Sequence, residues 1–500
     1  MRIARSSYRK WSFAIDRGGT FTDIIGVDAD GHIHSDKLLS ESTRYSDPAI
    51  EGIRRMLNIS PGAPIPDTLV AGIRMGTTVA TNALLERKGA SVALFTTRGF
   101  RDLLEIGYQN RPQLFALAIR KPEQIYRCVK EVDERIDEAG KVIRPLDLER
   151  TAADLRRIRR MGVSSVAIVL MHSWKNGSHE EKVAKMARDT GFRHVSASHE
   201  IMPLIKIVGR GQTTVVDAYL SPILVRYIES IRKSTGNIPL EFMQSSGGIT
   251  DAALFTGKDA IISGPAGGVI GSAAVAKINS IAESVGFDMG GTSTDVSRFD
   301  GTFEKVYEVT TGGIQFQASS LNVNTVAAGG GSLLWFDGQK LRVGPESAGA
   351  DPGPACYGHG GPLALTDANL LLGRLLPSYF PKTFGPSHDR PLDRKIVQEL
   401  FRDMASEVNE KLSTHLSPVQ VALGFVRIAN ETMAKAIKEI SVSRGYDVRT
   451  HALICFGGAS PQHACSIARI LGMRRIVIHP LVGLLSAYGI AMADQSRYAL

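Results

Sequence analysis

The chain has little cysteine and no long apolar run. Only four cysteines occur among 500 residues, and none forms a CxxC pair, which excludes a small disulfide scaffold and predicts a reducing compartment, the cytoplasm. No apolar stretch approaches the ~20 residues of a membrane helix, so we expect no membrane partner. Residues 1–11 are basic like a transit peptide, but strand-like SFAID begins at residue 12, so we interpret them as a basic tail.

Several catalytic signatures are also missing. No GxxxxGK[ST] phosphate loop occurs, and the nearest approach to GxGxxG, at 266–271, lacks its first glycine. The absence of a GxSxG elbow argues against a serine hydrolase. The histidines show neither HxH nor HExxH spacing, which predicts structural or solvated side chains in preference to a metal site.

Glycine is abundant, with 50 residues that cluster between apolar runs and suggest backbone turning around a ligand. The 43% hydrophobic and 22% charged residues are typical of a globular chain, and the length predicts several domains. The net charge of +9 is dispersed among acidic residues, so we expect no nucleic-acid partner.

One pattern, D-x-G-G-T-x-T-D, occurs twice. FAIDRGGTFTDIIGVDADG covers residues 13–31, and FDMGGTSTDVSRFDG covers residues 287–301. Because chance identity at this many fixed positions is improbable, the simplest architecture is two similar lobes, each with one glycine-rich hairpin.

The chemistry of this pattern suits phosphate. Paired glycines let backbone N–H groups point at an anion, and threonine hydroxyls add donors. Asp16 and Asp288 end apolar strands, where a carboxylate is costly unless it meets a donor or a cation such as Mg²⁺, usually through water. The alternative is an ordinary Gly-Gly turn with an Asx cap.

Other segments predict an α/β chain. Residues 146–162 predict a helix, residues 164–174 a buried strand, and Ser178 with Glu181 a capping box that opens another helix. Residues 374–395 predict a surface crossing, because they are rich in proline. Ser417 and Gln420 predict a second capping box before a helix that runs to about Ile440.

The C-terminal part of the chain predicts a βαβ unit over residues 451–480. In it, FGGAS at 456–460 joins a strand to a helix N-terminus and leaves a flat surface that suits adenosine. The loops VAAGGGS (326–332) and VGPESAGADPGPACYG (343–358) predict functional backbone whose contacts the sequence does not give.

Together these motifs resemble the actin, sugar-kinase and heat-shock-chaperone ATPase superfamily, and within it the hydantoinase A and 5-oxoprolinase family. The resemblance extends over nearly the whole chain and rests on further segments as well: MGTTVATNALLERKGA (75–90), IGYQNRPQLF (106–115), VDAYLSP (216–222), ISGPAGG (262–268) and TDANLLLGRL (366–375).

The resemblance implies an α/β fold of the duplicated two-lobe, actin-like (ribonuclease H-like) type with a nucleotide cleft between the lobes. It implies a hydantoinase A N-terminal-type lobe over residues 12–208, with the first hairpin. It also implies an ATPase-type domain over 209–500, with the second hairpin and the adenosine motif.

The implied activity is ATP-dependent opening of a cyclic amide, 5-oxo-L-proline to L-glutamate, through phosphorylation of the lactam carbonyl oxygen. The implied cofactors are ATP and Mg²⁺, the implied partner is a hydantoinase B-type subunit or domain, and homo-oligomerisation stays open. The residues implied for catalysis and for holding the metal are Asp16 and Asp288. The implied nucleotide contacts are Gly18, Gly19, Thr20, Thr22, Gly290, Gly291, Thr292, Thr294, Gly457 and Gly458. The implied substrate contacts are Gly76, Thr77, Thr78, Asn82 and Arg111.

This chain departs from the family pattern in three places. Ser246 and Asn322 stand where the pattern has acidic residues, and the chain stops at Leu500 where fused 5-oxoprolinases continue. Two alternatives therefore stay open. One is a hydantoinase or ketone-carboxylase subunit of the same family, and the other is a shortened, non-catalytic nucleotide-binding protein.

Overall fold

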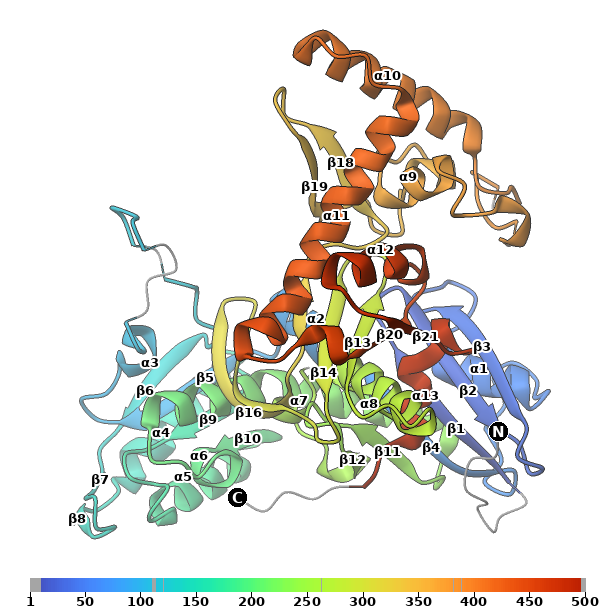
Figure 1. Cartoon of the computed structure of the whole chain (residues 1–500). Coiled ribbons are helices and arrows are strands. Elements are labelled where there is room, and N and C mark those ends of the chain that lie inside the picture. The colour runs from blue at the N-terminus through green and yellow to red at the C-terminus, as the bar shows by residue number, and fades with distance from the viewer. Residues whose placement is uncertain are drawn as a thin grey trace. The chain divides into compact units, whose positions relative to one another are not determined.

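The two copies of the repeated motif form the same element in two units of the chain. The computed structural model describes residues 10–109, 114–119, 121–261, 263–380, 382–387 and 389–495 (Figure 1). Unit 1 comprises Met1–Ala266, Lys305–Leu321 and Ala493–Leu500, and unit 2 comprises Gly267–Glu304 and Asn322–Met492. Most of the predicted tail 1–11 lies outside the described residues, and the predicted ranges 12–208 and 209–500 stay a prediction.

The main sheet of unit 1 has the order β12-β11-β4-β1-β2-β3. The first hairpin is β1 with antiparallel β2, β3 continues beyond β2, and β4 and β11 run parallel on the other side of β1. The strands are β1 (Trp11–Arg17), β2 (Phe21–Val27), β3 (Ile33–Leu39), β4 (Val70–Thr77), β11 (Leu240–Met243) and β12 (Ile249–Asp251).

The main sheet of unit 2 has the order β17-β14-β13-β20-β21. Here β13 and β14 form the second hairpin, antiparallel β17 continues beyond β14, and parallel β20 and β21 follow on the other side of β13. The strands are β13 (Ser284–Met289), β14 (Thr294–Phe299), β17 (Asn324–Val326), β20 (Ala452–Phe456) and β21 (Arg475–Ile478). Five strands thus repeat the order and directions of unit 1, which confirms the duplicated α/β fold.

Unit 1 carries a second sheet of four parallel strands, in the order β10-β9-β5-β6. Its strands are β5 (Val92–Thr97), β6 (Cys128–Val132), β9 (Ser165–Val169) and β10 (His194–Ala197). Helices α4 (Leu148–Arg160) and α5 (Ser178–Asp189) pack on this sheet through buried residues such as Leu155 and Val183. The remaining elements of unit 1 are α1 (Pro48–Met56), α2 (Val79–Leu85), α3 (Leu103–Ile106), β7 (Arg135–Ile136), β8 (Val142–Arg144), α6 (Ser198–Ile201), α7 (Ile207–Thr235), β15 (Lys305–Thr311) and β16 (Ile314–Leu321).

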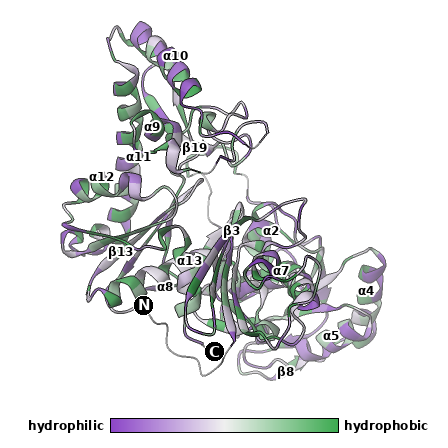
Figure 2. Ribbon diagram, turned by 90° about the vertical axis from the view of Figure 1, so that its right-hand side faces the viewer, coloured by the Kyte–Doolittle hydropathy of each residue, from purple (hydrophilic) through white to green (hydrophobic). Residues whose placement is uncertain are grey.

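In unit 2, helix α11 (Pro418–Ile440) packs on β14 and β17 and contacts α9 (Leu365–Leu371) and α10 (Arg394–Leu412). Hydrophilic and hydrophobic residues alternate along α10 (Figure 2), and its buried residues Val397, Phe401, Ala405 and Val408 form one face. The unit also contains β18 (Ser332–Phe336), β19 (Leu341–Ser347), α12 (Pro461–Leu471) and α13 (Leu485–Met492), while α8 (Ser263–Ile278) begins in unit 1 and ends in unit 2.

The structure confirms most predicted elements and corrects one detail. Residues 164–174 contain the buried strand β9, and the βαβ unit is β20, α12 and β21. The capping box predicted at Ser178 is wrong. Gly177 is the N-cap of α5. Ser178 N donates to Asn176 Oδ1 at 3.1 Å, so this N–H group is not available for the Glu181 side chain, as the capping box would require. In the part of the chain that the structure describes, every helix is too short or too polar to span a bilayer.

The capping box at the start of α11 is confirmed, since Ser417 Oγ accepts from Gln420 N at 3.3 Å and Gln420 Oε1 accepts from Ser417 N at 2.8 Å. Replacing Ser417 with alanine removes one of these bonds and should lower the free energy of unfolding of unit 2 by about 1 kcal/mol. Urea denaturation checks this, with Ser178→Ala as the control that removes no side-chain cap. Equal effects of the two variants would contradict the assignment.

Candidate functional site

The tip of the first hairpin is held from inside unit 1. Ser40 N donates to Thr20 O at 2.8 Å and Ser40 Oγ donates to Gly18 O at 2.7 Å. Thr22 is buried and its hydroxyl is hydrogen bonded to Ser40 Oγ at 3.0 Å, whereas Gly19 and Thr20 are exposed. The tip therefore offers Gly19 and Thr20 to a ligand, while Thr22 holds the turn.

Asp16 lies at the carboxyl end of β1, and its buried Oδ1 has no hydrogen-bond partner among the residues that the structure describes. Asp23 is directly opposite on β2, and Lys37 of β3 is opposite Asp23 and donates to its Oδ1. Burial raises the pKa of Asp16 to about 7, the nearby negative charge of Asp23 adds to the rise, and Lys37 opposes it. A cation or a donor at Asp16 would relieve this cost.

Most of the predicted substrate segment lies beside this hairpin. Gly76 is opposite Asp16 in the parallel pair of β1 and β4, and Thr78 N donates to Arg17 O at 3.1 Å. Asn82 of α2 lies near the tip, because a Cβ built on Gly19 would be 3.7 Å from Asn82 Nδ2. Thr77 Oγ1 accepts from Val79 N at 3.2 Å, which places Thr77 at the start of α2. Arg111 lies outside the described residues.

The second hairpin repeats the first in register. Asp288 is opposite Asp295 as Asp16 is opposite Asp23, and Gly290 N donates to Ser293 O at 3.1 Å. Gly290, Gly291 and Thr292 are exposed, whereas Thr294 is buried and donates to Ala328 O. Thus Thr294, like Thr22, holds its hairpin from within.

The third strand differs between the units. Thr325 of β17 takes the place of Lys37 and donates to Asp295 Oδ1 at 2.6 Å. Burial raises the pKa of Asp295, and the Thr325 hydrogen bond opposes the rise. In the second hairpin a neutral hydroxyl therefore donates to the aspartate of the second strand, whereas in the first hairpin an ammonium group does.

The loop VAAGGGS, whose contacts the sequence did not give, clamps the second hairpin. Gly330 N donates to Gly290 O at 3.0 Å and Gly331 N donates to Gly291 O at 2.6 Å. A Cβ on Gly329 would lie 2.6 Å from Gly291 O, so this close approach needs glycine. Sequence reasoning missed both this clamp and Ser40, because backbone contacts over long sequence distances carry no local signal.

Gly457 and Gly458 follow β20, which runs parallel to β13 as β4 runs parallel to β1. Gly457 has φ +84°, and a Cβ there would lie 2.3 Å from Asp288 Oδ1 and 2.6 Å from Met289 O. Gly458 is exposed, and a Cβ there would meet no atom within 4 Å. FGGA of unit 2 is thus the counterpart of the GTT segment of unit 1.

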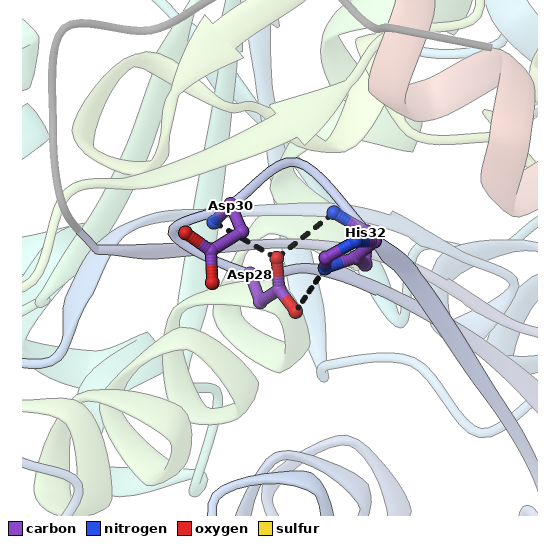
Figure 3. A group of neighbouring side chains, drawn as sticks. All are labelled: Asp28, Asp30 and His32. Carbon is purple, nitrogen blue, oxygen red and sulfur yellow. Dashed lines mark hydrogen bonds and ion pairs between the residues drawn. The ribbon is translucent and has the colours of Figure 1, made fainter.

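The prediction that the histidines are structural or solvated is confirmed for His463, which is structural. It is buried in unit 2, its Nδ1 is hydrogen bonded to Asn430 Oδ1 at 2.7 Å, and burial lowers its pKa to about 3. The cluster Asp28, Asp30 and His32 lies on an exposed turn of unit 1 (Figure 3). Asp28 Oδ1 accepts from Asp30 N at 3.0 Å and from His32 N at 2.8 Å, so the carboxylate stabilises the turn.

The two positions that depart from the family pattern, Asn322 and Ser246, have different surroundings. Asn322 Nδ2 donates to Glu304 Oε2 at 2.9 Å, which gives this amide a structural role in unit 2. Ser246 follows β11 in unit 1, and its buried hydroxyl has no hydrogen-bond partner in the described part of the chain. An acidic residue at either position would change the local charge, but only Ser246 leaves a buried polar atom unsatisfied.

Comparison with known proteins identifies two family regions. The model of the family described as Hydantoinase/oxoprolinase matches residues 210–498, and the model of its N-terminal region matches residues 12–191. The chain is 46% identical to 5-oxoprolinase 1 of Arabidopsis thaliana, covering 97% of this chain and 41% of the relative. It is 33% identical to the caprolactamase subunit alpha of Pseudomonas jessenii, covering 98% of this chain and 71% of that subunit. The chain thus spans less than half the length of the 5-oxoprolinase relative.

Two solved structures share the fold. The ATP-dependent caprolactamase from Pseudomonas jessenii superposes with a TM-score of 0.81 at 33% identity, over 97% of this chain and 71% of that one. The nucleotide-free acetone carboxylase superposes with a TM-score of 0.77 at 22% identity, over the same shares of the two chains. The second likeness concerns the fold alone.

Gly457→Ala should destabilise unit 2 by about 2 kcal/mol or more, because the new methyl group meets Asp288 in a left-handed conformation. Gly458→Ala is the matched control, since a Cβ there would meet no atom within 4 Å and its φ lies outside the left-handed region. Urea unfolding of both variants without nucleotide measures the difference. Equal stabilities would show that the Gly457 backbone is not constrained as described.

Asp16 should make stability depend on pH. Its raised pKa means that the folded chain binds a proton more tightly than the unfolded chain, so this contribution is full below about pH 4 and is lost as the pH rises toward 7. Asp16→Asn, which resembles the protonated form, should remove that loss. Unfolding midpoints between pH 4.5 and 7.5 check this, and identical pH profiles of the variant and the wild type would contradict it.

Proposed function

Because the chain belongs to the hydantoinase/oxoprolinase family, we propose that it opens a cyclic amide by ATP-dependent hydrolysis, with 5-oxo-L-proline as the acceptor and L-glutamate as the product. The observation that carries the proposal is the duplicated hairpin, whose exposed glycine tips accompany a buried, unpartnered carboxylate oxygen at Asp16. The relatives named 5-oxoprolinase support this acceptor. The caprolactamase of 33% identity supports the wider class of cyclic amides.

The proposed reaction answers a problem of amide chemistry. A lactam carbonyl carbon is a poor electrophile, and its oxygen already carries a lone pair. Attack of that oxygen on the γ-phosphorus forms a C–O–P linkage as the bond from the γ-phosphorus to the bridging oxygen breaks and ADP leaves. Water can then add to the activated carbon, after which the ring C–N bond breaks, the nitrogen takes up a proton and inorganic phosphate leaves the former carbonyl carbon. The first step needs positioning and charge neutralisation more than a general base.

The two hairpins would supply this positioning and charge neutralisation. The exposed backbone at Gly19 and Gly291 presents N–H groups, and the hydroxyls of Thr20 and Thr292 add donors for phosphate oxygens, while Gly290 N–H closes the second hairpin turn. Gly18 belongs to the same turn, and Thr22 and Thr294 fix the two hairpins through their buried hydroxyls. Gly458 leaves space for the adenosine part of the nucleotide, and Gly457 lets the backbone before it pass close to Asp288.

Asp16 and Asp288 are the residues that would hold Mg²⁺, through water. The fit rests on Asp16 Oδ1, which is buried and has no hydrogen-bond partner among the described residues, and on Asp288, which takes the same register position in the second hairpin. Bound Mg²⁺ would neutralise phosphate charge. Both carboxylates must be ionised for this role, so the raised pKa of Asp16 makes the proposed site sensitive to pH near 7.

The acceptor would lie near Gly76, Thr77, Thr78 and Asn82, of which Asn82 offers a side-chain amide close to the hairpin tip. Arg111 stays a predicted anchor for the carboxylate. We further propose that a hydantoinase B-type protein completes hydrolysis. The relative named subunit alpha supports the existence of a second subunit in the family.

The test is ADP release from Mg-ATP with 5-oxoproline, with and without an added hydantoinase B-type protein. Asp16→Asn and Asp288→Asn should each lower the 5-oxoproline-dependent rate by about 100-fold or more. Asp28→Asn, which changes a partly buried carboxylate in the turn after β2, should leave that rate within about twofold. Folded chain that binds ATP but releases no ADP with any cyclic amide would favour the non-catalytic alternative. ADP release with hydantoin or a ketone, but not with 5-oxoproline, would show that one of those compounds is the acceptor.

A further inference from the structure

A pocket of about 330 Å³ in unit 1 is lined by three arginines. Its walls are Arg98, Glu134, Arg135, Ile143 and Arg144, none of which belongs to the proposed nucleotide or acceptor site. Arg98 directly follows β5, Glu134 lies between β6 and β7, and the other three residues lie on β7 and β8, which form a two-stranded hairpin of their own (Figure 1). The pocket therefore lies where this hairpin meets the carboxyl ends of β5 and β6.

The pocket adjoins the point at which the second sheet of unit 1 reverses its strand order. Along the chain, β5 is followed by β6 on one side of it, whereas β9 and β10 lie on its other side. In open parallel sheets this reversal leaves a crevice outside the carboxyl ends of the strands, where ligands bind. Thr97 at the end of β5 donates to Glu134 Oε1, and its hydroxyl accepts at 2.8 Å from Met171 N, which follows β9. Glu134 thus connects the pocket with this crevice.

Two of the arginines face each other across the small hairpin. Arg135 of β7 is directly opposite Arg144 of β8 in the antiparallel pair. The Cβ atoms of directly opposite residues are about 5 Å apart, and like charges at such positions destabilise a strand pair. Arg98 adds a third guanidinium group to the same pocket. This arrangement costs free energy unless anions lie among the three positive charges.

Asp133 supplies one such anion. Its Oδ1 accepts from Arg144 Nη1 at 2.8 Å, and its Oδ2 accepts from Arg98 Nη1 at 3.1 Å. The hydrogen bond from Arg144 holds the pKa of Asp133 below its usual range, so this carboxylate is ionised. Because a guanidinium group has five N–H donors, both arginines keep donors beyond these two bonds.

Arg135 has no acceptor among the residues that the structure describes. Its side chain is half-buried, and its guanidinium carbon lies 5.1 Å from the centroid of the Phe100 ring. A guanidinium group held in this way presents a planar set of donors that matches the oxygens of a phosphate or a carboxylate. Arg135 is therefore the clearest sign of a missing anion.

Glu134 closes the inner end of the pocket without pairing with the arginines. Its side chain is buried, Thr97 donates to its Oε1, and its Oε2 is hydrogen bonded to His179 Nδ1 at 2.7 Å. Both carboxylate oxygens are thus engaged inside the unit. An anion in the pocket would lie toward the guanidinium groups and away from Glu134.

From this arrangement we propose that the pocket binds a phosphate group, either the inorganic ion or the phosphate of a small monoester. Three guanidinium groups against the one carboxylate of Asp133 leave two positive charges on this side of the pocket, which a phosphate dianion matches. The inference goes beyond the proposed function, because the pocket shares no residue with the hairpins and its ligand takes no part in the proposed reaction.

Calorimetric titration of the full chain with glycerol 3-phosphate, and separately with inorganic phosphate, tests the proposal. Arg135→Met should weaken the binding of both compounds about 10-fold or more, because it removes charge-assisted hydrogen bonds. Arg156→Met, which removes the same charge from an exposed position on α4, should bind both within about twofold of the wild type. Equal losses in the two variants, or a wild type that binds neither compound, would overturn the pocket.

The two compounds also identify the source of the phosphate group. Tighter binding of glycerol 3-phosphate than of inorganic phosphate would assign the pocket to a monoester, and the reverse order would assign it to the free ion. D-glycerate, which carries a carboxylate in place of the phosphate, should bind about 10-fold more weakly than glycerol 3-phosphate. Equal binding of D-glycerate would overturn the assignment to phosphate.

Asp288→Asn separates this pocket from the proposed nucleotide site. That variant should bind glycerol 3-phosphate like the wild type, and Arg135→Met should keep its affinity for ADP. If Asp288→Asn loses glycerol 3-phosphate and Arg135→Met retains it, the phosphate binds at the hairpins. The pocket then fails while the proposed function stands.

Thermal unfolding distinguishes a ligand-binding arginine from a structural one. Without phosphate, Arg135→Met should unfold at a midpoint no lower than that of the wild type, because Arg144 no longer faces a like charge. Glycerol 3-phosphate should raise the midpoint of the wild type and leave that of Arg135→Met unchanged. Earlier unfolding of the variant without ligand, or an equal rise in both proteins, would contradict the proposal.

Discussion

A carboxylate at the end of a buried strand costs free energy unless a cation or a donor meets it, and the first hairpin holds Asp16 in this position. Its neighbour Asp23 increases the cost, while Lys37 engages Asp23 and offsets only part of it. Much of the surrounding architecture keeps this arrangement in place. Ser40 holds the tip of the hairpin, Thr78 bonds the backbone of Arg17, and β4 supports β1 from the other side.

The hairpin of unit 2 has the same backbone arrangement, but different residues stabilise it. The register of Asp288 and Asp295 repeats that of Asp16 and Asp23, but a threonine hydroxyl replaces the lysine ammonium group on the third strand. Glycine backbone from the loop 329–331 replaces Ser40 as the support of the tip. The duplication therefore preserves the position of the leading carboxylate and the exposed tip, while each unit stabilises them with its own residues.

The motifs made the duplicated sheet predictable, because the residues of D-x-G-G-T-x-T-D are adjacent in sequence and determine a local hairpin. The FGGA junction and the capping box at Ser417 were predictable for the same reason. The glycine clamp on Gly290 and Gly291 was not predictable, since it joins loops far apart in the chain through backbone atoms. The cap at Ser178 was predicted wrongly because Asn176, just upstream, competes for the same backbone donor.

We propose that nucleotide binding depends on the leading carboxylate of each hairpin, Asp16 in the first and Asp288 in the second. Calorimetric titration of the full chain with ADP in the presence of Mg²⁺, at a pH above the pKa of Asp16, tests it most directly. We expect one nucleotide per chain, with an affinity that falls in Asp16→Asn and also in Asp288→Asn. Two independent nucleotides per chain, or an affinity that only one of the two substitutions changes, would contradict it.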